Sequence, residues 1–324
     1  MNLINLGDIY ESITKIRQRG ILFFFSKITF DKKKRTKSTF GETLKTGSNW
    51  WIIPEVKQRE NFKISGNYNT TFDSYLIDKY INNNKNINIL SVGCGAGNRE
   101  IRIAKNNPTA NILGLDLSKH LISTATKTAK KENINNIVFK DADFYTFELQ
   151  ENHFDIILFH SALHHFRNID PITLRIKKSL KDQGYLILNE YVGKNRLQFS
   201  FEQLDEMNKL LNKIPVQYRN RYLTKRTKNK IYAPGLIRMI ISDPSEAVES
   251  ETIIPIIHKH FKTIEEKKIG GDLLMMILKD IAHNFTGNES KESQKVLEML
   301  FEEEDQYLKK VDSPDFIFGI YQNR

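Results

Sequence analysis

Apolar and polar positions follow a repeating order in the middle third of the chain. Residues 87–92 alternate and then become continuously apolar, which is typical of a strand that enters a protein core. They run directly into a glycine-rich loop at 93–97, and a helix-like segment follows. The same order then recurs along the chain. We predict further strands at 111–116, 137–139, 154–159 and 184–190, and helices at 98–106, 118–132 and 171–180.

This alternation predicts βαβ units, in which helices cross between parallel strands, and therefore an α/β fold with a mostly parallel sheet. The flanking segments have a different character, because the first is basic and aromatic and the later ones look helical. We also expect strands at 261–269 and 316–321, with helices at 272–285 and 290–310. The expected organisation has four parts: an N-terminal extension (1–75), a core (76–195), a helical cap insertion (196–260), and the last strands with a second helical insertion (261–324).

The composition is that of a soluble globular protein. The chain has 324 residues, of which 40% are hydrophobic and 27% charged, and this excludes a disordered chain, a collagen and a membrane bundle. A single cysteine excludes a disulfide scaffold and a cysteine-based metal cluster, and indicates a reducing, cytoplasmic setting. No apolar run approaches the roughly 18 residues of a membrane span, and we expect no signal peptide.

The formal net charge of +10 attracts nucleic acid, anionic lipid or phosphorylated small molecules. The charge alone does not show which of these classes binds. The basic run at 31–37 is interpreted as a solvated loop. The run at 219–230 continues from aromatic residues interleaved with arginines, which suits phosphate binding and stacking; a solvated basic helix is the alternative. The apolar and basic stripe at 13–30 is expected to pack on the core or on a dimer partner, with peripheral membrane contact as the alternative.

The strongest chemical signal is the loop Gly93-Cys94-Gly95-Ala96-Gly97 after the first strand. Glycines at this place let the backbone turn tightly and approach a ligand closely, and the following helix offers unpaired N–H groups. Asp116 ends the second strand, 23 residues after Gly93. Its carboxylate suits the hydroxyls of a ribose, although an acid at the start of a helix is the alternative.

Asp143 and Phe144 follow the third strand. A carboxylate there can accept a hydrogen bond from an exocyclic amino group, and an aromatic ring can pack on a purine. Asp141 is the competing acid, and a solvated turn is the alternative for both.

Together these residues resemble the class I S-adenosylmethionine-dependent methyltransferase family over residues 85–192. The resemblance implies a doubly wound, Rossmann-like sheet with an antiparallel last strand. It implies that the glycines line the methionine part of the cofactor, that Asp116 holds the ribose, and that Asp143 with Phe144 holds the adenine. The full set of residues expected to bind S-adenosyl-L-methionine is Gly93, Gly95, Gly97, Asp116, Leu117, Asp143, Phe144 and His160.

One departure from the family pattern concerns Ser91, where the family often has an acidic residue.

The nearest alternative on the same fold is a dinucleotide-binding dehydrogenase, which requires Gly-x-Gly-x-x-Gly. Here the third glycine, Gly97, comes one residue too early for that pattern, and position 98 is Asn98. The spacing therefore favours the methyltransferase.

The ends of the fourth and fifth strands carry the candidate catalytic residues, because ligands bind at the carboxyl ends of strands in open α/β sheets. His164 or His165 is suited to accept a proton from a substrate hydroxyl or amine; capping of the following turn is the alternative. We expect no metal, since no clear carboxylate partner lies at ligand spacing. Glu190 is expected either to bind or deprotonate substrate, or to pair with an arginine.

The segment 243–250 is interpreted either as a helix start or as a group of acids that contact substrate. Together with residues 189–193 and Trp50-Trp51, it is loosely similar to methyltransferases from glycan or natural-product pathways. The expected function is O- or N-methyl transfer to a small molecule, carbohydrate-like or a natural product, such as a sugar or a phosphorylated or nucleotide-linked sugar. The alternatives are an RNA methyltransferase, which lacks support from any separate RNA-binding motif, and a non-catalytic cofactor-binding scaffold. The sequence leaves the oligomeric state open.

Overall fold

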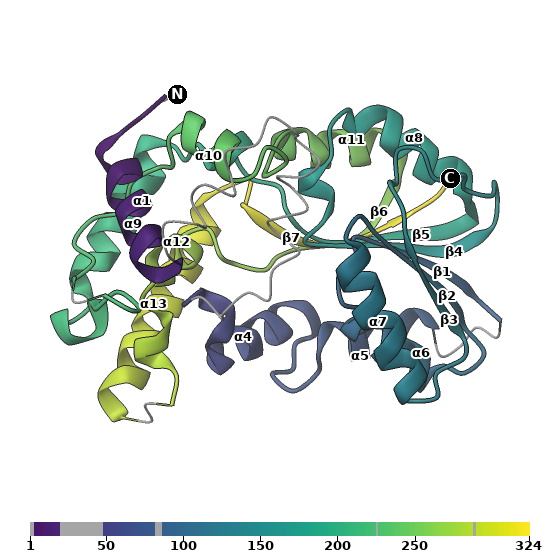
Figure 1. Ribbon diagram of the computed structural model, residues 1–324, viewed down its shortest axis with the longest axis horizontal. Coiled ribbons are helices and arrows are strands. Elements are labelled where there is room, and N and C mark those ends of the chain that lie inside the picture. The colour runs from purple at the N-terminus through teal and green to yellow at the C-terminus, as the bar shows by residue number, and fades with distance from the viewer. Residues whose placement is uncertain (1–2, 20–47, 82–85, 225, 288–289) are drawn as a thin grey trace. The chain divides into compact units, whose positions relative to one another are not determined.

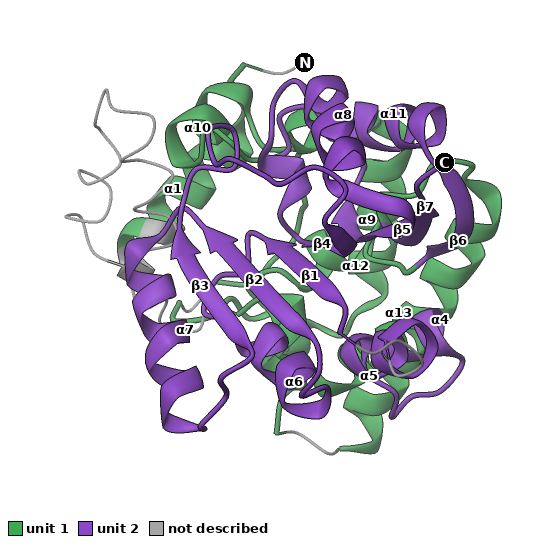
Figure 2. Ribbon diagram, turned by 90° about the vertical axis from the view of Figure 1, so that its right-hand side faces the viewer, with its two compact units in different colours: residues 1–60, 193–246, 269–316 green, residues 61–192, 247–268, 317–324 purple. Residues whose placement is uncertain are grey.

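The computed structural model describes residues 3–19, 48–81, 86–224, 226–287 and 290–324. The chain divides into two compact units, drawn in different colours in Figure 2. Unit 1 comprises residues 1–60, 193–246 and 269–316, and unit 2 comprises residues 61–192, 247–268 and 317–324. The basic run at 31–37 and most of the stripe at 13–30 lie outside the described residues.

The sheet has the strand order β3-β2-β1-β4-β5-β7-β6 (Figure 1). Strands β1 to β5 pair in parallel, and β6 pairs antiparallel with β7. The α/β class, the mostly parallel sheet and the antiparallel end of that sheet are therefore confirmed. The strands are β1 (Asn88–Val92), β2 (Asn111–Asp116), β3 (Ile137–Asp141), β4 (Phe154–His160), β5 (Leu180–Tyr191), β6 (Lys262–Lys268) and β7 (Phe316–Gln322).

The central strands β1, β2 and β4 are mostly apolar because both faces of the sheet are covered. Figures 1 and 2 show α5, α6 and α7 on one face and α8 and α11 on the other. By contrast, the edge strand β6 has the sequence KTIEEKK, and such charges discourage pairing with another chain. The helices of this unit are α5 (Phe72–Leu76), α6 (Asn98–Asn106), α7 (Lys119–Lys131), α8 (Ile169–Ser179) and α11 (Ile253–His260).

Caps account for where two of these helices begin. The Ser118 hydroxyl accepts a hydrogen bond from the Leu121 N–H at the start of α7. At the start of α8, the Ile169 N–H donates to Glu249, a residue 80 positions further along the chain. The partners of the first cap are close in the sequence, whereas the fold brings the partners of the second together.

Unit 1 is helical among its described residues. Its helices are α1 (Leu6–Arg19), α9 (Phe201–Lys213), α10 (Leu236–Ser242), α12 (Leu274–Leu278) and α13 (Lys291–Lys310), while α4 (Pro54–Ser65) runs across the boundary of the two units. None of the helices in the described ranges is long and apolar enough to cross a membrane. Shorter helical turns in the chain are η1 (Trp50–Ile52), η2 (Ile77–Ile81), η3 (Leu163–His165), η4 (Asn195–Leu197), η5 (Val216–Arg219), η6 (Ser250–Thr252) and η7 (Ala282–Phe285).

Two predicted helices are wrong in detail. The segment after Asp243 is a turn, because Ala247 adopts a φ of 46°, which ends helical geometry within one turn of Pro244. The predicted helix at 272–285 is broken into α12 and η7. Asp280 adopts a φ of 66° between them, which ends helical geometry.

Three buried carboxyl groups gather in unit 1. Glu304 accepts hydrogen bonds from the N–H groups at the start of α12 and pairs with Arg59 at 2.8 Å. Asp272 accepts from the Asp315 N–H at 2.9 Å, and Asp315 accepts from the Gln203 amide at 2.7 Å. Burial, reinforced by the neighbouring acids, raises the pKa of Asp272 well above its usual range and the pKa of Asp315 to about 6.

We expect the contribution of Asp272 and Asp315 to the thermal stability to fall as the pH rises from about 4 through 6, because over this range the unfolded chain releases protons that the folded state, with its raised pKa values, still holds. Asp315→Asn removes one such proton site while keeping an oxygen for Gln203. The variant should therefore melt above the wild type at pH 7, and the difference should shrink towards pH 4. Melting curves at several pH values measure it. A difference between variant and wild type that does not change with pH would contradict the assignment.

Candidate active site

The carboxyl ends of the parallel strands bring the candidate residues to one edge of the sheet. Strand β1 lies between β2 and β4, and Val92 at its end is in register with Leu115 and Phe159. At the end of β4, His160 is in register with Asn189 of β5. The strand order reverses at β1, and such a switch point is where open α/β sheets bind ligands.

The three positions of the loop require glycine for different reasons. All have positive φ angles, of 74°, 57° and 71° for Gly93, Gly95 and Gly97. A Cβ at Gly93 would lie 2.5 Å from the Ala162 side chain, and one at Gly97 would lie 2.5 Å from the Phe139 ring, so both serve close packing. A Cβ at Gly95 would meet nothing within 4 Å. The loop is therefore open at Gly95, where a ligand can approach the backbone.

Asp116 is tied to this loop. Its carboxylate accepts hydrogen bonds from the Gly95 N–H at 2.9 Å and from the Ser118 N–H at 2.7 Å, one on each oxygen. A carboxylate offers about four acceptor positions, so each oxygen can accept again. The half-buried Asp116 and the open backbone at Gly95 thus fit a ribose diol next to the methionine part of S-adenosylmethionine.

The structure changes the expectation for Phe144. The ring is 3% exposed and packs edge-on against Phe159 and Phe166, so it belongs to the core of unit 2 and not to a surface on which a purine stacks. Leu117 is 41% exposed beside Asp116 and offers apolar surface instead.

The two candidate acids near the end of β3 have different surroundings. Asp143 is half-buried and accepts a hydrogen bond from the Tyr145 N–H at 3.1 Å. Asp141 is exposed and in register with Asp116. Asp141 ends β3, the strand next to β2, and Asp143 follows it, so both remain candidates for the amino group of an adenine.

Glu100 is a residue that the sequence analysis missed. Its carboxyl group is 1% exposed and accepts a hydrogen bond from the Ser91 hydroxyl at 2.8 Å, across nine positions of the chain. Burial raises the pKa of Glu100. Helix α6 thus places an acid beside the position where the family often has one at the end of the first strand.

The Ser91–Glu100 contact predicts how the stability changes when the acid is moved from position 100 to position 91. Ser91→Asp alone sets a second buried carboxyl against Glu100, and we expect a loss of about 2–4 kcal/mol of unfolding free energy. Adding Glu100→Gln should restore most of that loss, because one acid and one hydrogen-bond partner are present again. Denaturant unfolding of both variants measures the effect. Equal stability of the single and double variants would contradict the proposed exchange.

Glu190 and His164 form a buried pair at the ends of β5 and β4. Glu190 Oε1 accepts hydrogen bonds from the Ala162 and Leu163 N–H groups at 2.6 and 2.7 Å, and Oε2 lies 2.7 Å from His164 Nδ1. These bonds hold a turn in which Ser161 has the unfavourable φ of 52°. Neither predicted role of Glu190, substrate contact or pairing with arginine, matches these contacts. Glu190 is a positioning residue for His164 and its turn.

The chemistry of this pair follows from its atoms. An ionised carboxylate only accepts hydrogen bonds, so the proton of the neutral His164 ring is on Nδ1 and Nε2 carries the lone pair. A general base requires this tautomer, because Nε2 can then accept a proton.

The two other histidines of the segment have different surroundings. His165 is half-buried, and its ring centroid lies 4.2 Å from that of His164. His160 packs against the Phe72 ring edge, and burial, with the Arg99 charge, lowers the pKa of His160 well below its usual value. His160 is therefore neutral at physiological pH and can both donate and accept a hydrogen bond.

Comparison with known proteins identifies the family. A family model described as a methyltransferase domain matches residues 83–268. An uncharacterised methyltransferase of Schizosaccharomyces pombe is 31% identical over 126 residues, which are 37% of this chain and 44% of that protein. Phosphoethanolamine N-methyltransferase 1 of Triticum aestivum is 28% identical over 132 residues, 41% of this chain and 26% of that protein. The matched part of the chain thus spans less than half the length of each of these relatives.

A similar solved structure is geranyl diphosphate C-methyltransferase from Streptomyces coelicolor, in complex with Mg²⁺, geranyl-S-thiolodiphosphate and S-adenosyl-L-homocysteine. The TM-score is 0.50 at 9% identity, with 89% of this chain and 84% of that chain covered, which shows a shared fold. The family match extends over more than half of the chain and includes the glycine loop, Asp116 and the strand ends. The chain belongs to the class I S-adenosylmethionine-dependent methyltransferase family, whose methyl donor is S-adenosylmethionine.

Proposed function

We propose that this protein transfers a methyl group from S-adenosylmethionine to a hydroxyl or amino group of a small molecule. The observation that carries the proposal is the buried His164–Glu190 pair at the sheet edge that also holds the glycine loop. It supplies a positioned base next to residues that fit the donor.

Four residues are proposed to hold the donor, which supplies a methyl group already activated by its sulfonium when it is bound. Asp116 accepts hydrogen bonds from the ribose hydroxyls, and the backbone at Gly95 approaches the methionine part. Leu117 packs on the adenine, and Asp143 accepts from its amino group.

His164 is proposed as the general base. Its Nε2 takes the proton of the acceptor O–H or N–H while the acceptor atom forms its bond to the methyl carbon. Glu190 stabilises the imidazolium that results, through the hydrogen bond to Nδ1. A positioned base contributes about 10²–10⁴-fold, and holding the acceptor at about 3–3.5 Å from the methyl group supplies more.

A small-molecule acceptor is supported by the relative from wheat, which is named for phosphoethanolamine. Within that class we propose a carbohydrate-like or natural-product acceptor, on the loose similarity of residues 189–193 and 243–250 to methyltransferases from such pathways. A cytoplasmic setting is part of the proposal, because the single cysteine fits a reducing compartment.

The test is a methyl-transfer assay with labelled S-adenosylmethionine and a panel of acceptors. The panel contains amino alcohols and their phosphates, free sugars, sugar nucleotides and a short RNA. Transfer to a small molecule that is lost in His164→Gln supports the proposal. Transfer to the RNA alone, or binding of the donor with no transfer to any acceptor, would favour the RNA methyltransferase or the scaffold instead.

A further inference from the structure

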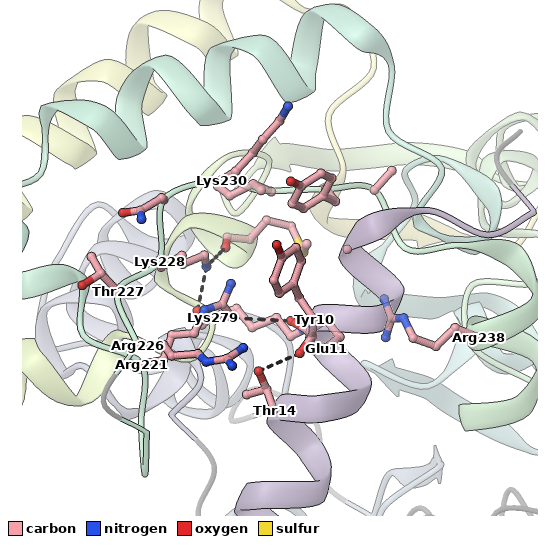
Figure 3. Close-up of a pocket in the computed structure, with 16 residues that line it drawn as sticks. Tyr10, Glu11, Thr14, Arg221, Arg226, Thr227, Lys228, Lys230, Arg238 and Lys279 are labelled. Carbon is pink, nitrogen blue, oxygen red and sulfur yellow. Dashed lines mark hydrogen bonds and ion pairs between the residues drawn. The ribbon is translucent and has the colours of Figure 1, made fainter.

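Unit 1 contains a cavity of about 250 Å³ with basic walls (Figure 3). Helix α1 forms one wall with Tyr10, Glu11 and Thr14. Residues between 221 and 233, Arg238 of α10 and the end of α12 form the rest. Six of the 16 lining residues are Lys or Arg, whereas Glu11 is the single acidic one. The lining cations are Arg221, Arg226, Lys228, Lys230, Arg238 and Lys279.

Acidic residues neutralise only part of this charge. Arg226 and Lys230 are exposed, and neither has a carboxylate partner among the residues that the structure describes. Lys230 Nζ lies 5.3 Å from the centre of the Tyr232 ring. The cations with carboxylate partners are Arg221 with Glu11 and Asp280, Lys279 with Glu11, and Arg238 with Asp8.

Lys228 adds a buried positive group to the same cavity. It is 4% exposed, and its Nζ donates to three carbonyl oxygens at the end of α12, those of Met276, Ile277 and Lys279, at 2.6–2.9 Å. Burial, together with the charges of Arg221 and Lys279, lowers the pKa of Lys228 to about 7. An anion in the cavity would offset this repulsion between like charges.

We propose that this cavity binds the phosphate or diphosphate group of a small molecule, held by Arg226 and Lys230, with Tyr10 and Tyr232 beside the remainder of the ligand. An arginine guanidinium matches phosphate with two parallel hydrogen bonds, and two uncompensated cations match a doubly charged group. The volume lies just below the 300–1,000 Å³ of typical ligand pockets, which suits such a group and not a polymer.

This proposal does not rest on the proposed methyl transfer. Every residue proposed to hold the methyl donor belongs to unit 2, whereas every residue of this cavity belongs to unit 1. Binding can therefore be measured without S-adenosylmethionine, and its failure would leave the proposed methyl transfer untouched.

The experiment is calorimetric titration of the full chain with pyrophosphate and with uridine diphosphate at low salt. The test variant is Arg226→Ala/Lys230→Ala, two exposed residues whose loss leaves the core intact. The matched control is Arg219→Ala/Lys213→Ala, which removes the same charge from unit 1 outside the cavity. The melting temperature of each variant serves as the check that it is folded.

We expect one site for pyrophosphate, weakened at least about thirtyfold in the test variant and less than about threefold in the control. Uridine diphosphate should compete for that site. Three results would overturn the proposal: no binding of either probe, equal weakening in both variants, or tight binding of a 20-nucleotide RNA that pyrophosphate does not displace. The last result would identify the basic segment as a nucleic-acid surface.

Discussion

Asp116→Ala is expected to weaken the binding of S-adenosylmethionine at least about 100-fold. The substitution removes both acceptor oxygens proposed to hold the ribose, and hydrogen bonds to a charged group contribute about 1.5–3 kcal/mol each. It also leaves the Gly95 N–H without its carboxylate, which loosens the loop at its open position. Calorimetric titration measures the affinity.

Asp116→Asn is the matched variant, because it keeps one oxygen for the loop while it loses the charge. We expect it to lie between the wild type and Asp116→Ala. Glu132→Ala, an exposed acid at the end of α7, is the control for charge and should bind like the wild type. Wild-type affinity in Asp116→Ala would remove Asp116 from the donor site.

Glu190→Gln is expected to lower kcat about 10²–10⁴-fold while the affinity for the donor is unchanged. The glutamine oxygen can still accept from the Ala162 and Leu163 N–H groups, but its NH₂ then faces His164 Nδ1. The ring must take the other tautomer, with its proton on Nε2, and it can no longer accept a proton from the acceptor. Steady-state kinetics with an identified acceptor measure the effect.

The pH dependence of the rate separates a role of Glu190 in positioning His164 from a purely structural role. In the wild type, the rate should rise with pH as His164 loses its proton, and Glu190→Gln should abolish that limb. His164→Gln should lose as much activity as Glu190→Gln, whereas His165→Gln should lose little. The reverse order for the two histidines would make His165 the base.

Local signals explain why the sequence predicts so much of unit 2. Strands β1, β2 and β4 lie where the apolar pattern places them, and Ser118 caps the helix that it precedes. Wrong boundaries arise where a residue takes a left-handed backbone conformation, as Ala247 and Asp280 do. A periodic pattern of apolar positions does not reveal such a residue.

The site is predicted in part for the same reason. The glycines and Asp116 form a motif with fixed spacing, so they are found without a structure. His164 and Glu190, 26 positions apart, become partners only through the crossover from β4 to β5. Ser91 and Glu100, nine positions apart, meet only when the chain turns from β1 into α6. The basic cavity likewise needs α1 beside residues 221–233, two segments separated by about 200 positions. Contacts of this kind are not visible in one sequence.

The most direct test of the account is titration of the purified protein with S-adenosylmethionine, with NAD as the comparison. We expect one S-adenosylmethionine per chain and no binding of NAD, because Gly97 comes one residue too early for the dinucleotide pattern Gly-x-Gly-x-x-Gly. Folded protein that binds NAD, or that binds neither ligand, would contradict the assigned donor site.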